Sequence, residues 1–206
     1  TAGDALTTGN ANVLIGMNAG GNFDAEEHNI AIGRSAFSGA SSADYCVVIG
    51  GTALQGNATQ NGTIAVGYNA SNALTTGLGN VAIGYTALQQ NVTGARNLAV
   101  GYGAMGLSGG GTCDTSGDNV FLGYNSGGGD WSAGAAATNQ YNVAVGNYTM
   151  DAALAGANYN TCLGHNAGTG LTSGDDNIFL GASAGGAMLS GTHNTFIGNS
   201  AGSNDN

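Results

Sequence analysis

The sequence NVAIGYTAL, residues 80–88, decides the fold, and 17 residues later the chain repeats it as NLAVGYGAM, residues 97–105. Both stretches run Asn, aliphatic, any residue, aliphatic, Gly, and both reach an Ala three residues after the Gly. Aliphatic residues that alternate with other residues and stop at a Gly are typical of a short β-strand that ends in a turn.

The same unit recurs along the whole chain. Eleven glycines close it, with spacings of 17, 17, 17, 17, 17, 22, 23, 18, 17 and 17 residues: Gly16, Gly33, Gly50, Gly67, Gly84, Gly101, Gly123, Gly146, Gly164, Gly181 and Gly198. A 17-residue unit is too short for a pair of helices, and frequent Gly disfavours helix. We therefore predict an all-β protein, a single-chain parallel β-solenoid (β-roll) of eleven coils with a 17-residue repeat. Residues 1–206 form one domain in this prediction, a rod about 50 Å long.

Each strand is predicted to bury its two aliphatic residues, which stand one and three positions before the closing Gly. Pairs such as Val81 and Ile83 follow the two-residue period of a strand with one buried face. The Ala three positions after the Gly is small enough for a return strand to pass close by. Each coil is thus expected to hold two short strands and two corners.

An Asn stands four positions before the Gly in nine copies. Stacked coils would bring these residues into line about 4.8 Å apart, where their amides can bond along the rod axis. We predict a structural Asn ladder formed by Asn12, Asn29, Asn80, Asn97, Asn119, Asn142, Asn160, Asn177 and Asn194. Binding of a ligand by this row is the less favoured alternative.

The residue between the two aliphatic positions is then expected to point outward. This column contains no charged residue: Leu14, Ala31, Val48, Ala65, Ala82, Ala99, Phe121, Ala144, Cys162, Phe179 and Phe196. An apolar stripe of this length is more than a monomer normally leaves in water. It predicts a lateral interface around a three-fold axis, with Leu14, Phe121, Phe179 and Phe196 as the main contacts. The alternative is that a return strand or an insertion covers the stripe.

The two long spacings predict insertions within about residues 106–118 and 127–141, on successive coils. The second insertion contains the only Trp, Trp131, next to Asp130, and it ends at Tyr141. An exposed aromatic residue on a Gly-rich loop is a common contact for sugar or protein, so these three residues are candidate binding residues. Trp131 could instead fold down and cover the rod.

Charge excludes two classes of partner. The chain has a formal net charge of −10 and only two Lys or Arg residues, whereas nucleic acids and anionic membranes attract basic surfaces. No apolar run approaches the roughly 18–20 residues that a membrane-spanning helix needs. We expect no nucleic-acid partner and no membrane insertion.

The sequence does not predict a catalytic site. Gly-x-Ser-x-Gly occurs at residues 181–185 and 198–202, but both matches are copies of the repeat and neither stands between a strand and a helix, as a catalytic elbow does. No Asp–His pair recurs, so we do not expect an enzyme, a cofactor or a metal. Cys46 takes a ladder position and Cys162 lies in the middle column of its strand, six coils away, about 29 Å at the strand spacing. Both are expected to be free thiols, as is Cys113 in the first insertion.

The quoted repeats resemble the head repeats of trimeric (YadA-like) autotransporter adhesins. They are more similar still to the related glycine-rich repeats of phage tail fibres, in which a Tyr follows the Gly and an Asn-x-Thr-Gly turn, as at residues 91–94, precedes the next copy. The 17-residue unit is longer than that of the autotransporter heads. The resemblance implies a parallel β-roll, usually trimeric, that carries a host-binding surface.

We therefore expect a structural or adhesive rod segment of an extracellular, cell-surface or virion fibre. Its expected partners are copies of itself, as a homotrimer or stacked end to end, and a glycan or protein of a host surface. Two alternatives remain open: a self-polymerising extracellular filament and an ice-binding solenoid, although the latter lacks flat Thr-x-Thr rows.

Overall fold

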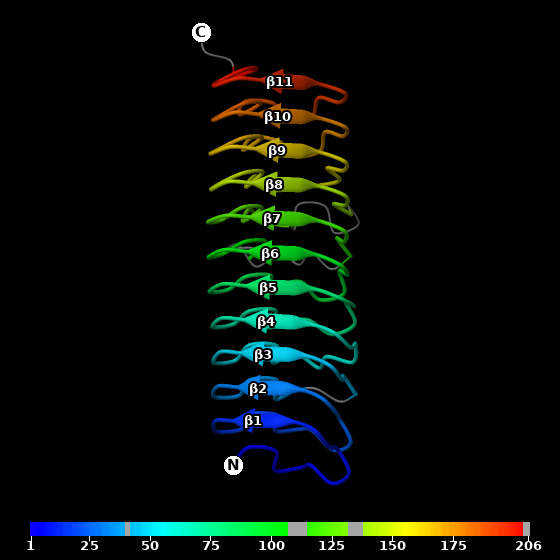
Figure 1. Cartoon of the computed structure of the whole chain (residues 1–206). Coiled ribbons are helices and arrows are strands. Elements are labelled where there is room, and N and C mark those ends of the chain that lie inside the picture. Colours follow the sequence, from blue (N-terminus) through cyan, green and yellow to red (C-terminus); the bar gives the residue numbers. More distant parts are fainter. Residues whose placement is uncertain (40–41, 107–114, 132–137, 204–206) are drawn as a thin grey trace.

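The chain forms one stack of coils around a parallel sheet (Figure 1). The structure, a computed structural model, describes residues 1–39, 42–106, 115–131 and 138–203. The sheet has eleven strands in the order of the chain, one strand in each coil. They are β1 (Val13–Ile15), β2 (Ile30–Ile32), β3 (Val47–Ile49), β4 (Ile64–Val66), β5 (Val81–Ile83), β6 (Leu98–Val100), β7 (Val120–Leu122), β8 (Val143–Val145), β9 (Thr161–Leu163), β10 (Ile178–Leu180) and β11 (Thr195–Ile197).

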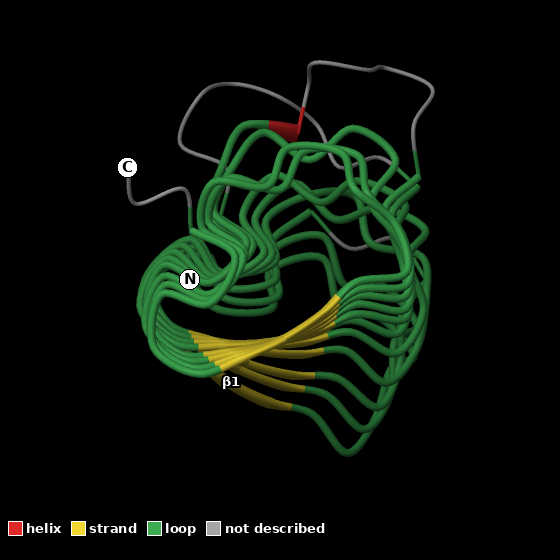
Figure 2. Cartoon of the chain, turned by 90° about the horizontal axis from the view of Figure 1, so that it is seen from above, coloured by secondary structure: helices red, strands yellow, loops and turns green. Residues whose placement is uncertain are grey.

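Equivalent residues of neighbouring coils lie side by side. Val81 pairs with Leu98, Ala82 with Ala99, and the same register continues through all eleven strands. Seen along the rod axis, all the strands lie on one side, and turns and loops form the rest of each described coil (Figure 2). The predicted β-solenoid and its 17-residue repeat are thus confirmed.

Each coil holds one strand, so the prediction of two strands per coil is wrong. After the closing Gly, the residues at the second and fourth positions adopt left-handed backbone conformations, as Thr86 (φ 54°) and Leu88 (φ 53°) do. An extended strand cannot contain such bends. The turns are nevertheless bonded from coil to coil, because the amide of Leu88 donates to the carbonyl of Ala104 (2.9 Å) and that of Thr86 to Tyr68 (2.9 Å).

The closing positions require Gly for two reasons: their backbone has a positive φ, and the next coil leaves no space for a side chain. Gly33 has φ 132°, and a Cβ placed on it would lie 2.7 Å from the carbonyl oxygen of Gly50 in the next coil. Its neighbours in the column have the same conformation. Any side chain at this position would push two coils apart.

The middle residue of each strand points inward, the reverse of the orientation predicted from the sequence. In all eleven strands the middle residue is less exposed than both of its neighbours: it is buried in β2 to β10 and half-buried in β1 and β11. The members of this column with no exposed surface are Ala31, Val48, Ala65, Ala82, Ala99, Phe121, Ala144, Cys162 and Phe179. The column is therefore the core of the solenoid, and the flanking aliphatic residues face outward.

The four side chains that were predicted to form a lateral interface belong to the core of the rod or pack against it instead. Phe121 and Phe179 are fully buried, while Leu14 and Phe196 pack partly buried against the core in the first and last strands. The rings of Phe179 and Phe196 stack inside the rod with centroids 5.5 Å apart. Phe121 and Phe179 cannot contact another molecule without unfolding of their coils.

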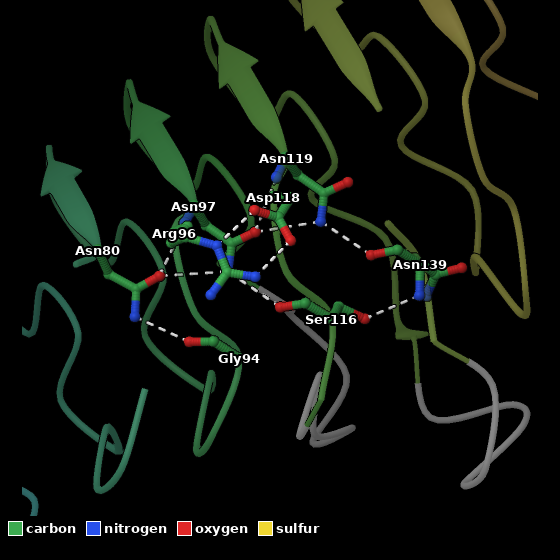
Figure 3. A network of polar contacts seen from close by, with 8 residues as sticks. All are labelled: Asn80, Gly94, Arg96, Asn97, Ser116, Asp118, Asn119 and Asn139. Carbon is green, nitrogen blue, oxygen red and sulfur yellow. Dashed lines mark hydrogen bonds and ion pairs between the residues drawn. The ribbon is translucent and has the colours of Figure 1, made fainter. Parts of the chain in front are cut away.

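From Asn80 to Asn194, the Asn residues form a continuous hydrogen-bonded row on the same inner side, part of which is shown in Figure 3. Asn97 donates its backbone N–H (2.9 Å) and its Nδ2 (3.2 Å) to the Oδ1 of Asn80, and its Nδ2 also donates to the carbonyl of Ser116 (2.9 Å). Asn119 bonds to Asn97 in the same way. The pattern continues through Asn142, Asn160, Asn177 and Asn194. Each buried amide is thus satisfied by the coils above and below it.

The row is interrupted at two coils. The backbone N–H of Cys46 still donates to the Oδ1 of Asn29 (2.9 Å). The Cys46 side chain has no carboxamide, however, so the row of side-chain hydrogen bonds stops there. Thr63 occupies the next position, fully buried, and its Oγ1 has no hydrogen-bond partner among the described residues. The ladder consequently has one short section, Asn12 to Asn29, and one long section that begins at Asn80.

The inward orientation predicts very unequal losses of stability for two neighbouring substitutions. Phe179→Ser removes a fully buried ring and is expected to destabilise the rod by about 3–5 kcal/mol. Ile178→Ser changes a side chain that is 45% exposed and is expected to cost about 1 kcal/mol or less. Denaturant titrations followed by circular dichroism, at one low protein concentration, measure both. Equal midpoints for the two variants would contradict the orientation.

Candidate functional site

The outer side of the sheet is a largely aliphatic surface. It consists of the first and third residues of all eleven strands, which we call the aliphatic face. Exposed fractions reach 57% for Ile15, 40% for Ile83 and 66% for Ile197. Its two polar members are Thr161 and Thr195, and none of the eleven strands contains a charged residue.

The aliphatic face is regular because the strands are parallel and in register. Each coil contributes two outward side chains, and each of them lies beside its equivalent in the next coil, as Ile49 beside Val66 and Val66 beside Ile83. Neighbouring strands are about 4.8 Å apart. The result is two rows of mostly aliphatic side chains that run the length of the rod.

A row of stacked tyrosines borders the aliphatic face on the side where the strands end. It consists of the residues that follow the closing Gly in four consecutive coils, and we call Tyr68, Tyr85, Tyr102 and Tyr124 the tyrosine row. Successive ring centroids are 5.4, 4.9 and 5.2 Å apart, with interplanar angles of 19° or less. Each ring is between 41% and 49% exposed. The row thus presents aromatic edges and hydroxyl groups at the spacing of the coils.

A second surface row precedes the strands and is more varied. Tyr141 lies here, 46% exposed, and its ring stacks on that of Tyr159 with centroids 4.9 Å apart. Two coils earlier, the guanidinium of Arg96 makes two contacts of 2.6 Å with the carboxylate of Asp118 (Figure 3). The hydrogen bonds from Arg96 hold the pKa of Asp118 below its usual value. Because this pair is solvated, it contributes little to stability.

A recess lies beside the tyrosine row, across the coils of β5, β6 and β7. Its volume is about 370 Å³. The side chains that line it are aromatic or neutral and polar: Tyr85, Thr86, Gln89, Tyr102, Tyr124 and Asn125, with Gly103, Gly106 and Gly128. None of the described residues that line it is charged.

Trp131 is not available as a surface contact. It is 2% exposed, and its ring lies 5.6 Å from that of Phe121, centroid to centroid. The indole therefore covers the core, the second of the two roles that the sequence left open. Asp130 is half-buried beside it, while Tyr141 is exposed in the row before β8. The remaining parts of the predicted insertions, residues 107–114 with Cys113 and residues 132–137, lie outside the described residues.

Two cysteines are buried and free. Cys46 and Cys162 have no exposed surface and form no disulfide. Desolvation raises the pKa of both thiols, that of Cys162 to about 12. Neither thiol can act as a nucleophile on a molecule in solution.

Within the described ranges, no group of three or more His, Cys, Asp or Glu side chains could hold a metal ion. In the same part of the chain, no helix is long and apolar enough to cross a membrane. Comparisons with protein-family models, with curated proteins and with solved structures found no match. The function proposed below therefore rests on the surfaces described above.

The buried thiols predict selective resistance to alkylation. In a Cys113→Ser background, iodoacetamide at pH 8 is expected to leave Cys46 and Cys162 unmodified for hours, because pH 8 lies far below the pKa of about 12 that burial gives Cys162. The thiolate fraction of that group at pH 8 is about one in ten thousand. Denaturant should expose both to complete alkylation. Peptide mass spectrometry measures the sites, and rapid modification of Cys162 in the folded chain would contradict its inward position.

Proposed function

We propose that this chain is a structural and adhesive rod segment of an extracellular or virion fibre, in which copies of the chain pack side by side through the aliphatic face. The observation that carries the proposal is that both residues flanking the middle column are exposed or half-buried in every strand, and that all of them except Thr161 and Thr195 are aliphatic. An uncharged, mostly aliphatic surface of this length favours association, because soluble monomers seldom expose so long an apolar patch.

The aliphatic face is suited to a second copy of the same chain. It has no charges to desolvate or to pair, so two such faces can meet without an electrostatic penalty. Its rows have one spacing along the whole rod, so parallel copies in register place like residues opposite each other. Full burial of an aliphatic side chain contributes about 1.5–3 kcal/mol. Each coil would contribute part of this free energy from each of its two outward residues.

A closed ring of three rods would bury the aliphatic face of each copy around a common axis. The symmetry is the one expected from the resemblance to trimeric adhesin heads, but the contacts differ from those expected. They would involve residues such as Ile49, Ile83 and Ile178, which flank the middle column. The tyrosine row would then remain on the rim, accessible to a glycan or protein of a host surface.

End-to-end polymerisation is a second candidate, because all neighbouring coils stack through one parallel strand register, a contact that a further copy of the chain could repeat. Unbounded filaments in electron micrographs of the purified chain would favour this candidate over a closed oligomer. Ice binding receives less support, because Thr occupies the aliphatic face only in β9 and β11.

The proposal predicts that polar isosteres on the aliphatic face dissociate the oligomer. The triple variant Ile49→Thr, Ile83→Thr, Ile178→Thr is expected to sediment as a monomer while keeping its β-rich circular dichroism spectrum. Threonine is compatible with the first strand position, that of Ile178, since Thr161 and Thr195 already occupy it, and a β-branched residue also suits the third strand position, that of Ile49 and Ile83. Sedimentation velocity of the variant and of the unmodified chain measures the change.

A matched control removes exposed aliphatic groups elsewhere. Leu78 and Leu189 are 48% and 62% exposed and lie outside the strands, so Leu78→Thr with Leu189→Thr should leave the oligomer unchanged. If the unmodified chain is monomeric at high concentration, lateral association through the aliphatic face is ruled out.

A further inference from the structure

The recess beside the tyrosine row results from missing side chains in two consecutive coils. The fifth position after the closing Gly carries Asn72 in the coil of β4 and Gln89 in that of β5, but Gly106 and Gly128 in the next two. The coil of β6 also has Gly103 at the second position. Where these side chains are absent, the surface is hollowed and the rings of the tyrosine row form a wall.

The recess is bounded along the rod axis. At the end nearer the N-terminus, the coil of β5 places Thr86 and Gln89 in the lining. Beyond its upper end, the coil of β8 restores full-sized side chains at the same two positions, Tyr148 and Asp151. A ligand that fills the recess would therefore lie along the rod and span the coils of β5 to β7.

The polar groups of the recess are uncharged and available to a ligand. The side chains of Thr86, Gln89 and Tyr102 make no hydrogen bond to the described residues, and Gln89 and Thr86 are only half-buried. Amide and hydroxyl groups can both donate and accept hydrogen bonds. Tyrosine adds an apolar ring with a polar tip, which suits ligands with mixed apolar and hydroxylated surfaces.

From this geometry we infer that the recess binds a neutral, linear oligosaccharide, laid parallel to the rod axis against Tyr85, Tyr102 and Tyr124. A saccharide chain presents hydroxyl groups and C–H surfaces in alternation, and it repeats along its length as the tyrosines do, with ring centroids 4.9 and 5.2 Å apart. An anionic polymer is disfavoured by the net charge of −10 and by the lack of a cation in the lining. A few oriented polar groups beside aromatic walls are usual in ligand sites.

This inference rests on the proposed adhesive function and names its ligand class. It differs from the site predicted on the insertion, because Trp131 is buried and Tyr141 lies in the row at the other end of the strands. The tyrosine row stands outside the aliphatic face, so lateral packing and saccharide binding use different side chains and can be tested separately.

The test is a titration of the full chain with neutral β-1,4-linked hexasaccharides of glucose and of N-acetylglucosamine, with hexagalacturonate as the charged comparison. Calorimetry measures affinity, and NMR follows the tyrosine ring resonances. Saturable binding of a neutral hexasaccharide that shifts the resonances of Tyr102 and Tyr124 is the expected result. No saturable binding of either neutral hexasaccharide, or equal binding of hexagalacturonate, would overturn the inference.

The chain supplies a matched pair of variants. Tyr102→Ala with Tyr124→Ala removes two stacked, exposed rings from the recess and is expected to weaken binding at least about tenfold. Tyr141→Ala with Tyr159→Ala removes a similar stacked pair, 46% and 57% exposed, from the opposite row and should leave affinity within about twofold. Equal losses in the two variants, with both folded by circular dichroism, would show that the recess is not the site.

Sedimentation of the same samples separates the two proposals. If the chain sediments as an oligomer but binds no neutral saccharide, the saccharide inference is wrong and the proposal of lateral packing stands. A monomer that binds the hexasaccharide through Tyr102 and Tyr124 would support the recess and overturn lateral packing.

Discussion

A buried asparagine that bonds to the asparagine of the next coil is the constraint on which this structure depends. Its side chain must lie inside the rod, because Asn97 takes its partners from Asn80 and from a turn carbonyl that closes the interior. Side chains alternate along a strand. Once the Asn four positions before the Gly faces inward, the residue two positions before the Gly must do so as well. The two aliphatic residues are then forced outward.

The small interior follows from the same geometry. Each coil closes around the Asn row, one middle-column residue and the Ala after the closing Gly, and many middle residues are themselves Ala. Leucine, methionine or phenylalanine fills the remaining space from a left-handed backbone position, as Leu88 and Met105 do. Such a conformation costs about 1–3 kcal/mol, which the inter-coil hydrogen bonds and the burial of the side chain offset. The aliphatic residues on either side of the middle column alternate with it and therefore face outward, and their exposure creates the surface from which the proposed association follows.

Sequence periodicity was sufficient to predict the solenoid, since the eleven glycines and their 17-residue spacing leave few alternatives. The orientation of the strands was predicted wrongly because aliphatic residues were expected to be buried. The Asn column contained the missing information: an inward Asn80 requires an inward Ala82, and the small size of Ala82, Ala99 and Ala144 agrees with a narrow core. The sequence also displays a Tyr after four consecutive closing glycines, a signal for the tyrosine row. The recess was beyond prediction, because it depends on how the side chains around Gly106 and Gly128 pack.

Hydrogen exchange of the asparagine side-chain amides tests the central constraint most directly, whatever the oligomeric state. In an NMR exchange experiment, the carboxamide protons of Asn97, Asn119, Asn142 and Asn160 are expected to exchange as slowly as the backbone amides of the strands, because they are buried and bonded. Those of the exposed Asn18 and Asn22 should exchange at once. If the ladder carboxamides exchange as fast as these two, the asparagines are not inside the rod and the orientation of every strand described here is wrong.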